Sequence, residues 1–273
     1  MSETLNSDIK SVVARGLKYR VTAMRLGNLA VDSSGLLFGS PSGTIVDIPV
    51  WGALVEGPGV KMLVDTGIKN PAWVSERLGP CWQGERETMV GALEVLGWRP
   101  RDIETVVNTH LHFDHTGNNH YFSHAQFYVS RREWDAVDHP HESQRVLYEE
   151  RAWLDDPLTA DSYTLIDRDD FVLASGLWVI QTPGHSLGHQ SLLVNTDQGV
   201  VCVVGDAVNI EQNFTSHTPG GVYVSIPDAT QSLEKIQACS DRVLMSHDAR
   251  VVDFQQNDFP LVPSPEQIAP ACC

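Results

Sequence analysis

One histidine-rich segment, HLHFDH at residues 110–115, constrains this chain more than any other feature of its sequence. The segment follows an apolar run at residues 105–109 that is typical of a β-strand. His110 and His112 therefore leave a strand two residues apart, and in extended backbone such side chains point to the same side. The two imidazoles can bind one ion, so the segment predicts a metal site at a strand end.

Asp114 and His115 follow at once, where a turn or helix start can direct them toward a second ion position. A polar loop with solvent-exposed histidines is the alternative. Apolar Leu111 and Phe113 alternate with the polar residues, which argues against that alternative. We therefore expect Asp114 and His115 to be metal ligands as well.

Three further apolar runs end in a possible ligand: His185 in WVIQTPGHSLGH, Asp206 in GVVCVVGDAV and His247 in RVLMSHD. A lone histidine is more often a hydrogen-bonded structural residue, and a lone aspartate more often caps a helix. Imidazole and carboxylate together are the usual ligands of divalent transition metals. Because all three strand ends carry one, we expect them to join the histidine-rich segment.

The order of elements predicts an α+β fold. Strands are expected at residues 19–31, 44–55, 60–65, 105–109, 171–182, 190–195, 200–204 and 242–246, and helices at residues 71–78, 87–96, 131–137, 143–154 and 229–238. Two strand-rich halves, each followed by helices, favour an αββα sandwich of two mostly antiparallel sheets flanked by helices.

The domain organisation is expected to be simple. The 273 residues include 42% hydrophobic side chains, enough for a sizeable core, and show no repeat or low-complexity tract. We expect a single domain over residues 1–273, with an N-terminal arm at residues 1–18 and a C-terminal tail at residues 255–273.

The charge narrows the possible partners. The sequence has 19 Lys and Arg against 35 Asp and Glu, a formal net charge of −16. Nucleic acids and anionic membranes are repelled by such a chain, so we expect neither, and a neutral small-molecule substrate instead. The N-terminal segment lacks the apolar core of a secretion signal, which predicts a cytoplasmic protein.

The chain resembles the metallo-β-lactamase superfamily, whose HxHxDH motif is matched by residues 110–115. The resemblance extends over about residues 51–247. It implies that His110, His112 and His185 bind one metal ion, that Asp114, His115 and His247 bind a second, and that Asp206 bridges them. Zinc is expected for these two divalent ions, while iron, manganese and cobalt share the same ligand preferences.

Within that superfamily, the stretches MLVDTG, NTHLHFDHTGNN, TPGHSLGH, GDA and SHD are most similar to the quorum-quenching N-acyl-homoserine lactonases and relatives such as 4-pyridoxolactonase. The resemblance implies that a metal-bound hydroxide attacks the carbonyl of a lactone ring and that Asp114 shuttles the proton. It also implies a homodimer.

One position departs from the lactonase pattern. Quorum-quenching lactonases usually carry a tyrosine three residues after the bridging aspartate, and this chain has Asn209 there. Asn209 is therefore expected to be the second catalytic residue beside Asp114, donating a hydrogen bond through its amide, with Tyr223 as the alternative donor. His189 is expected to support a ligand, and Trp51, Phe113, Phe122 and Trp153 are candidate pocket walls.

Other activities on the same kind of site stay open: hydrolysis of an ester, a thioester, an organophosphate or a cyclic amide. A β-lactamase proper is disfavoured because the second ion site consists of histidine and aspartate alone. A flavodiiron oxidoreductase would carry glutamate where this chain has His112. A metal-storing protein would keep the ligands without needing a substrate pocket.

Overall fold

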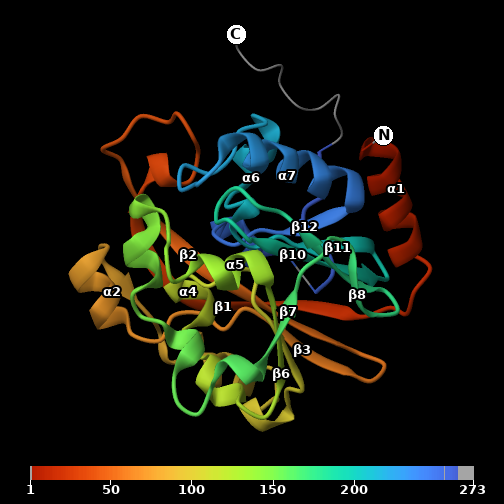
Figure 1. Cartoon of the computed structure of the whole chain (residues 1–273), viewed down its shortest axis with the longest axis horizontal. Coiled ribbons are helices and arrows are strands. Elements are labelled where there is room, and N and C mark those ends of the chain that lie inside the picture. Colours follow the sequence, from red (N-terminus) through yellow and green to blue (C-terminus); the bar gives the residue numbers. More distant parts are fainter. Residues whose placement is uncertain (1, 255, 264–273) are drawn as a thin grey trace.

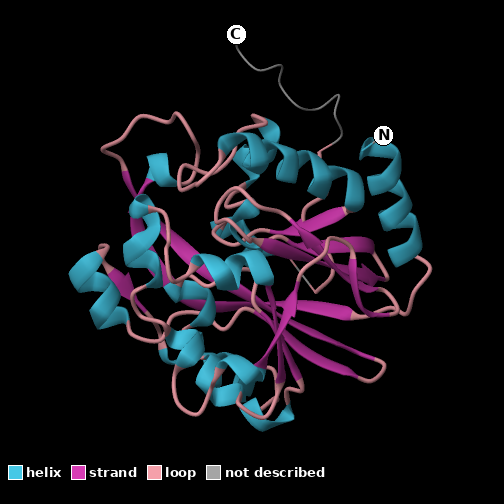
Figure 2. Ribbon diagram, viewed as in Figure 1, coloured by secondary structure: helices cyan, strands magenta, loops and turns pink. Residues whose placement is uncertain are grey.

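The structure is a computed structural model that describes residues 2–254 and 256–263. Its strands form two sheets in the middle of the molecule, and helices cover the outer side of each sheet (Figures 1 and 2). The predicted αββα sandwich is therefore confirmed. Side chains from the two inner faces, among them Val55 and Val64 of one sheet and Leu192 and Val203 of the other, make one shared apolar core.

The first sheet has seven strands in the order β4-β1-β2-β3-β5-β6-β7. These are β1 (Arg20–Asp32), β2 (Ile45–Gly57), β3 (Val60–Val64), β4 (Cys81–Trp82), β5 (Thr105–Val107), β6 (Gln126–Ser130) and β7 (Tyr163–Ile166). The pairings among β4, β1, β2 and β3 are antiparallel, while β3-β5, β5-β6 and β6-β7 are parallel. The sheet is therefore mixed, because helical segments return the chain to the same end before each of the last three strands.

The second sheet has five strands in the order β12-β11-β10-β9-β8. These are β8 (Phe171–Ala174), β9 (Leu177–Gln181), β10 (Gln190–Thr196), β11 (Gly199–Val203) and β12 (Arg242–Leu244). Here the mostly antiparallel expectation holds, since only β11 and β12 run parallel. The expected strand at residues 171–182 is a hairpin, turned by Gly176 at a φ of 86°.

Seven α-helices complete the part of the chain that the structure describes: α1 (Ser2–Val13), α2 (Pro71–Arg77), α3 (Met89–Val95), α4 (Phe113–Thr116), α5 (Arg131–Ala136), α6 (Glu211–Thr215) and α7 (Ile226–Cys239). The side chain of Ser225 caps α7 by accepting a hydrogen bond from the backbone of Asp228. Helix α7 then buries Leu233 and Ile236 against the second sheet together with Val13 of α1. On the other side, Leu93 of α3 packs on the first sheet.

One expectation needs correction, and the structure adds detail to two others. Residues 143–154 form short 3-10 segments (Glu142–Tyr148 and Ala152–Leu154) instead of a continuous α-helix, and the two segments are separated at Arg151, whose φ of 46° is left-handed. The predicted N-terminal arm contains α1, whose Ile9 and Val13 are buried. The predicted tail packs in its described part, 256–263, where Phe259 joins the core between the sheets.

No helix among the described residues is long and apolar enough to cross a membrane.

Candidate metal centre

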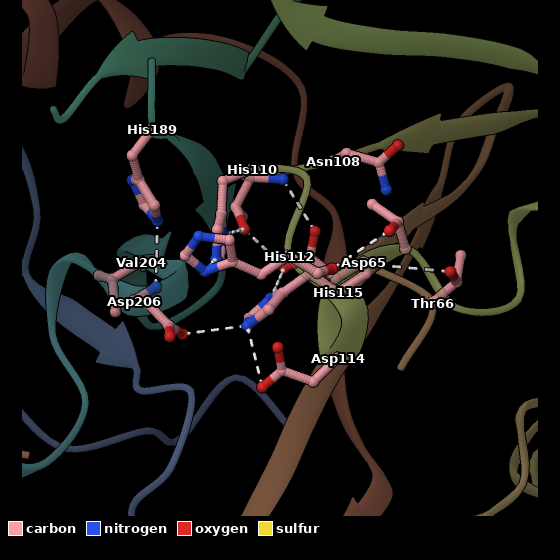
Figure 3. A network of polar contacts seen from close by, with 12 residues as sticks. Asp65, Thr66, Asn108, His110, His112, Asp114, His115, His189, Val204 and Asp206 are labelled. Carbon is pink, nitrogen blue, oxygen red and sulfur yellow. Dashed lines mark hydrogen bonds and ion pairs between the residues drawn. The ribbon is translucent and has the colours of Figure 1, made fainter. Parts of the chain in front are cut away.

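The histidine-rich segment lies where β5 ends in the first sheet (Figure 3). Strand β5 ends at Val107, and His112, five residues further along the chain, has an extended backbone with a φ of −68° and a ψ of 158°. Helix α4 begins directly afterwards, and the backbone amides of His115 and Thr116 donate to the carbonyl of His112. The segment between β5 and α4, together with α4 itself, therefore carries all four predicted ligands.

The three remaining predicted ligands come from the second sheet. His185 follows β9, Asp206 follows β11 and His247 follows β12. All seven residues are buried, with exposed fractions of 7% or less. The strand ends of both sheets therefore meet at one buried site, as the sequence predicts.

His110, His112 and His185 form the first cluster. The Nε2 atom of His110 lies 2.9 Å from Nδ1 of His112, and Nε2 of His185 lies 3.0 Å from the same atom. Nitrogen ligands held at about 2.0–2.1 Å from one tetrahedral zinc ion would be roughly 3.3 Å apart. The three nitrogens are thus nearly at the spacing that a shared ion requires.

Asp114, His115 and His247 form the second cluster, in which all ligand atoms lie within 4.8 Å of one another. The Nε2 atom of His115 is 3.7 Å from Oδ2 of Asp114, and Nε2 of His247 is 3.9 Å from that oxygen. These separations are too long for hydrogen bonds and leave room for an ion between the three groups.

Asp206 stands between the two clusters. Its Oδ2 atom lies 3.4 Å from Nε2 of His185, and its Oδ1 atom lies 3.1 Å from Nε2 of His115. Although close, Oδ1 of Asp206 and Nε2 of His115 are both buried without a hydrogen-bond partner among the described residues. Buried polar atoms are rarely left unpaired, so two that face a common point fit metal ligands. The carboxylate is positioned to bridge two divalent ions.

The three histidines of the first cluster are in the protonation state that a metal ion binds. Burial lowers the pKa of His110, His112 and His185 below the ordinary value for histidine, and nearby imidazoles contribute. These side chains are therefore neutral near pH 7, and a metal ion binds the neutral imidazole.

In the second cluster, burial and neighbouring charges shift the pKa values in opposite directions. Burial works against the charge of Asp206, yet the imidazoles of His247, His115 and His185 hold its pKa well below the usual range. Burial also opposes a proton on His115, but Asp206 and other carboxylates outweigh it and raise its pKa. Burial raises the pKa of Asp114. Protons here occupy the place that a cation would take, so metal binding should release them.

The two imidazoles of the second cluster are each held by a contact to the ring nitrogen that faces away from the cluster. Nδ1 of His115 lies 2.7 Å from Oδ2 of Asp65, and Nδ1 of His247 lies 2.9 Å from the carbonyl oxygen of Pro49. As expected, His189 supports a ligand: its Nε2 accepts a hydrogen bond from the backbone amide of Asp206 (3.0 Å). Asp65 was not singled out from the sequence, although it too follows an apolar run, in MLVDTG.

A cavity of about 190 Å³ opens beside the two clusters. Its polar lining residues include Asp114, Asp206, His247 and Asn209, and its apolar walls are mainly aliphatic: Leu29, Val31, Leu36, Ile48, Leu78, Phe113, Leu147 and Val222. Of the four aromatic walls predicted, only Phe113 lines it. Trp51 packs instead in the core between the sheets, and Phe122 and Trp153 pack in the cluster between the first sheet and its helices.

Asn209 and Tyr223 lie in different settings. Asn209 lines the cavity, is 3% exposed, and its Oδ1 is buried without a hydrogen-bond partner among the described residues. The ring of Tyr223 is 36% exposed and contacts Phe38 edge-on, with ring centroids 5.4 Å apart. Asn209 is therefore the better placed of the two to meet a ligand in the cavity.

Known proteins match this chain over most of its length. A sequence model described as the Metallo-beta-lactamase superfamily matches residues 46–244. An N-acyl homoserine lactonase of Bacillus cereus is 32% identical over 203 residues, covering 71% of this chain and 77% of the relative. The N-acyl homoserine lactonase AttM of Azorhizobium caulinodans is 27% identical over 247 residues, covering 84% and 93%.

Solved structures of lactonases are also similar to this chain. An N-acyl homoserine lactone hydrolase, with the product N-hexanoyl-L-homoserine bound at its catalytic metal centre, superposes with a TM-score of 0.73 at 27% identity. The match covers 87% of this chain and 96% of that one. The dizinc lactonase AidC, at 16% identity and a TM-score of 0.64, shares the fold.

Proposed function

The chain belongs to the metallo-β-lactamase superfamily and is a metal-dependent hydrolase, and we propose that it opens the ring of a neutral lactone such as an N-acyl homoserine lactone. One observation carries this proposal: Asp206 stands between two buried ligand clusters that border an apolar cavity. The similarity to N-acyl homoserine lactonases supports the substrate class.

Seven side chains would hold two divalent ions, for which we propose zinc. His110, His112 and His185 would hold one ion, Asp114, His115 and His247 the other, and Asp206 both. Imidazole and carboxylate ligands without thiolate suit zinc. When bound, two such ions activate water at neutral pH and polarise the carbonyl oxygen of the substrate.

The cavity walls would bind the apolar part of the substrate. Leu29, Val31 and Ile48 come from the two longest strands of the first sheet, Leu36 from the connection between them, and Leu147 from the 3-10 segment Glu142–Tyr148. Aliphatic walls favour an acyl chain and keep bulk water away from the reacting carbonyl. No charged group of the substrate is required by this lining, in keeping with a neutral molecule.

Two residues of the chain would act on the substrate directly. Asn209 can donate a hydrogen bond from its Nδ2 to an oxygen of the ring or of the acyl group. Asp114, whose pKa is raised by burial, can take the proton of the attacking water at Oδ2 and pass it to the alkoxide that leaves when the ring opens. No side-chain nucleophile is needed.

A substrate panel tests the proposal. Purified protein loaded with zinc is assayed against N-acyl homoserine lactones of several chain lengths, aliphatic and aromatic lactones, a thioester, a phosphotriester and a cyclic amide. We expect kcat/KM for at least one lactone to exceed the values for the other classes by about tenfold or more.

A higher kcat/KM for the thioester, the phosphotriester or the cyclic amide would replace the lactone with that substrate while keeping the metal centre. No turnover of any lactone by protein that holds two ions would overturn the proposal.

A further inference from the structure

We propose that Glu133 is a positioning residue that holds the three-histidine cluster together by tying its two ligand segments to helix α5. The inference rests on the proposed metal centre but not on the identity of the substrate. Glu133 is 0% exposed and is the one fully buried residue of α5, a helix in which Trp134 also packs partly buried against the core. Its charge is thus buried at a position where a packing side chain would be ordinary.

Four hydrogen bonds converge on this carboxylate. Oε1 accepts from the backbone amide of Leu111 (3.1 Å) and from the hydroxyl of Tyr148 (2.7 Å). Oε2 accepts from the hydroxyl of Ser186 (2.7 Å) and from the backbone amide of Gly188 (3.0 Å). Two donors on each oxygen satisfy an ionised carboxylate, which accepts only.

The donors come from the two segments that supply the first cluster. Leu111 lies between the ligands His110 and His112, at the end of the first sheet. Ser186 directly follows the ligand His185 and comes from the second sheet. One side chain therefore joins ligand segments of two different sheets.

The same two segments are joined outside the ligands by Gln190, whose backbone amide and side-chain amide donate to the carbonyls of Thr109 and Asn108. Glu133 therefore adds a restraint next to the ligands themselves.

Tyr148 extends the effect to the ring of His112. The two rings meet edge-on with centroids 4.6 Å apart, while the hydroxyl of Tyr148 is bound to Glu133. Gly188 shows how closely the second segment approaches α5, since a Cβ atom there would lie 1.9 Å from the backbone nitrogen of Glu133. Both contacts restrict where the ligands can move.

The second cluster is anchored without Glu133. Asp65 holds His115, and the backbone of Pro49 holds His247. Loss of Glu133 should therefore affect one ion site and spare the other. A general loss of stability would not produce this asymmetry.

Glu133→Gln is the sharpest change because it keeps the size of the side chain. An amide has one acceptor oxygen and one NH₂ group, so the NH₂ group must face one of the two pairs of donors. The hydroxyl in that pair can rotate to accept, but the backbone N–H of Leu111 or Gly188 cannot. One backbone restraint on a ligand segment is then lost.

The experiment measures Zn²⁺ binding to metal-free protein by competition with a chromophoric chelator, which requires no substrate. We expect Glu133→Gln to weaken one of the two bound equivalents by about 10–100-fold and to leave the other unchanged. Glu133→Asp, which keeps the charge, should recover part of the affinity.

Background variants identify the affected site. His247→Ala removes a ligand of the second cluster, and in that background Glu133→Gln should still weaken the remaining ion. His185→Ala removes a ligand of the first cluster, and there Glu133→Gln should have no effect. The opposite pattern, or equal weakening in both backgrounds, would overturn the proposal.

A serine pair provides a matched control. Ser186→Ala removes one donor to Glu133, whereas Ser240→Ala removes a buried hydroxyl that donates over the same 2.7 Å to a backbone carbonyl of α7. Only Ser186→Ala should weaken Zn²⁺ binding. If Glu133→Gln does not fold, the two serine variants provide the test, and equal Zn²⁺ affinity of the two would refute the proposal.

Wild-type Zn²⁺ affinity in Glu133→Gln would also refute the proposal. A protein that binds zinc but opens no lactone would refute only the proposed function.

Discussion

Four of the five ligand imidazoles, all except His112, have their other ring nitrogen in contact with a partner in the fold. His110 contacts the hydroxyl of Thr109 (3.0 Å), and His185 contacts the carbonyl oxygen of Val222 (3.0 Å). Asp65 and the backbone of Pro49 do the same for the second cluster. Such partners fix the ring orientation and the tautomer, so the site is arranged before an ion arrives.

Asn209 gives the first residue-level prediction. If its amide donates to the substrate, Asn209→Ala should lower kcat/KM for the best lactone roughly 5- to 100-fold, the equivalent of losing one hydrogen bond worth about 1–3 kcal/mol. The zinc content should stay at two equivalents. Steady-state kinetics and elemental analysis measure both quantities.

Asn70→Ala serves as the control, because that asparagine only caps α2 through the backbone amide of Trp73. It should lower thermal stability without changing kcat/KM. Unchanged kinetics in Asn209→Ala would remove this residue from the substrate site.

Glu150 gives a second residue-level prediction, about pH. Burial raises the pKa of Glu150 to about 7, and Asp155 and Asp114 add to the rise against the opposing charge of Lys69. A raised pKa favours the folded protein below the unfolded value, near 4.5, and this contribution is lost as the pH rises through about 7.

Glu150→Gln should therefore leave the free energy of unfolding nearly unchanged at pH 4.5 and increase it at pH 8, by about 1 kcal/mol once solvent screening is allowed for. Denaturant unfolding at the two pH values measures this. Glu149→Gln, at an exposed neighbour, should show no such difference between pH values. Equal effects of Glu150→Gln at both pH values would disprove the account.

At the scale of elements, the ligands were predictable because they obey a rule of position. Each follows an apolar strand, and strand ends at one edge of a sandwich meet. The supporting residues obey no such rule. Glu133 sits in a short helix whose sequence, RREWDA, gives no sign that this glutamate is buried, since only the packing of two distant segments creates its four hydrogen bonds.

Gly205 gives a prediction at the turn after β11. It has a φ of 52°, and a Cβ atom would lie 2.7 Å from Nε2 of His189, the atom that holds the backbone of Asp206. Gly205→Ala should thus both strain the backbone and displace the bridging ligand. We expect a lower melting temperature and weaker Zn²⁺ binding.

Gly59→Ala isolates the backbone contribution. Gly59 has a φ of 68°, and a Cβ atom there would meet no other atom of the described residues within 4 Å. Alanine at this position should therefore cost only the left-handed conformation, about 1–2 kcal/mol. Gly205→Ala should cost more than that and should alone affect zinc. Equal costs, with equal zinc affinity, would show that the close approach at Gly205 is unimportant.

At the scale of the whole molecule, the sequence predicts the sandwich but not all of its boundaries. Alternating apolar runs identify most strands, whereas the short β4 and the parallel strands β6 and β7 carry weaker patterns. Helix α1 has few apolar residues, and only its contact with the second sheet and α7 explains its position. The cavity walls were misjudged because local sequence does not show which apolar cluster a side chain joins: Phe113 lines the cavity, while Trp153 packs between the first sheet and its helices.

The metal centre depends on how the two sheets are placed relative to each other. Neither sheet alone supplies a complete ion site, because the first contributes His110, His112, Asp114 and His115 and the second contributes His185, Asp206 and His247. Packing of the sheets through their shared apolar core is therefore what assembles the metal centre.

Stepwise reconstitution tests the central claim most directly. Metal-free protein is titrated with Zn²⁺ while the opening of an N-acyl homoserine lactone is followed by the acid it releases. Two sites that share Asp206 predict that activity reaches its maximum at two equivalents per chain and that Asp206→Asn abolishes this maximum. Full activity at one equivalent or without metal, or no ring opening with two ions bound, would contradict a dinuclear lactonase.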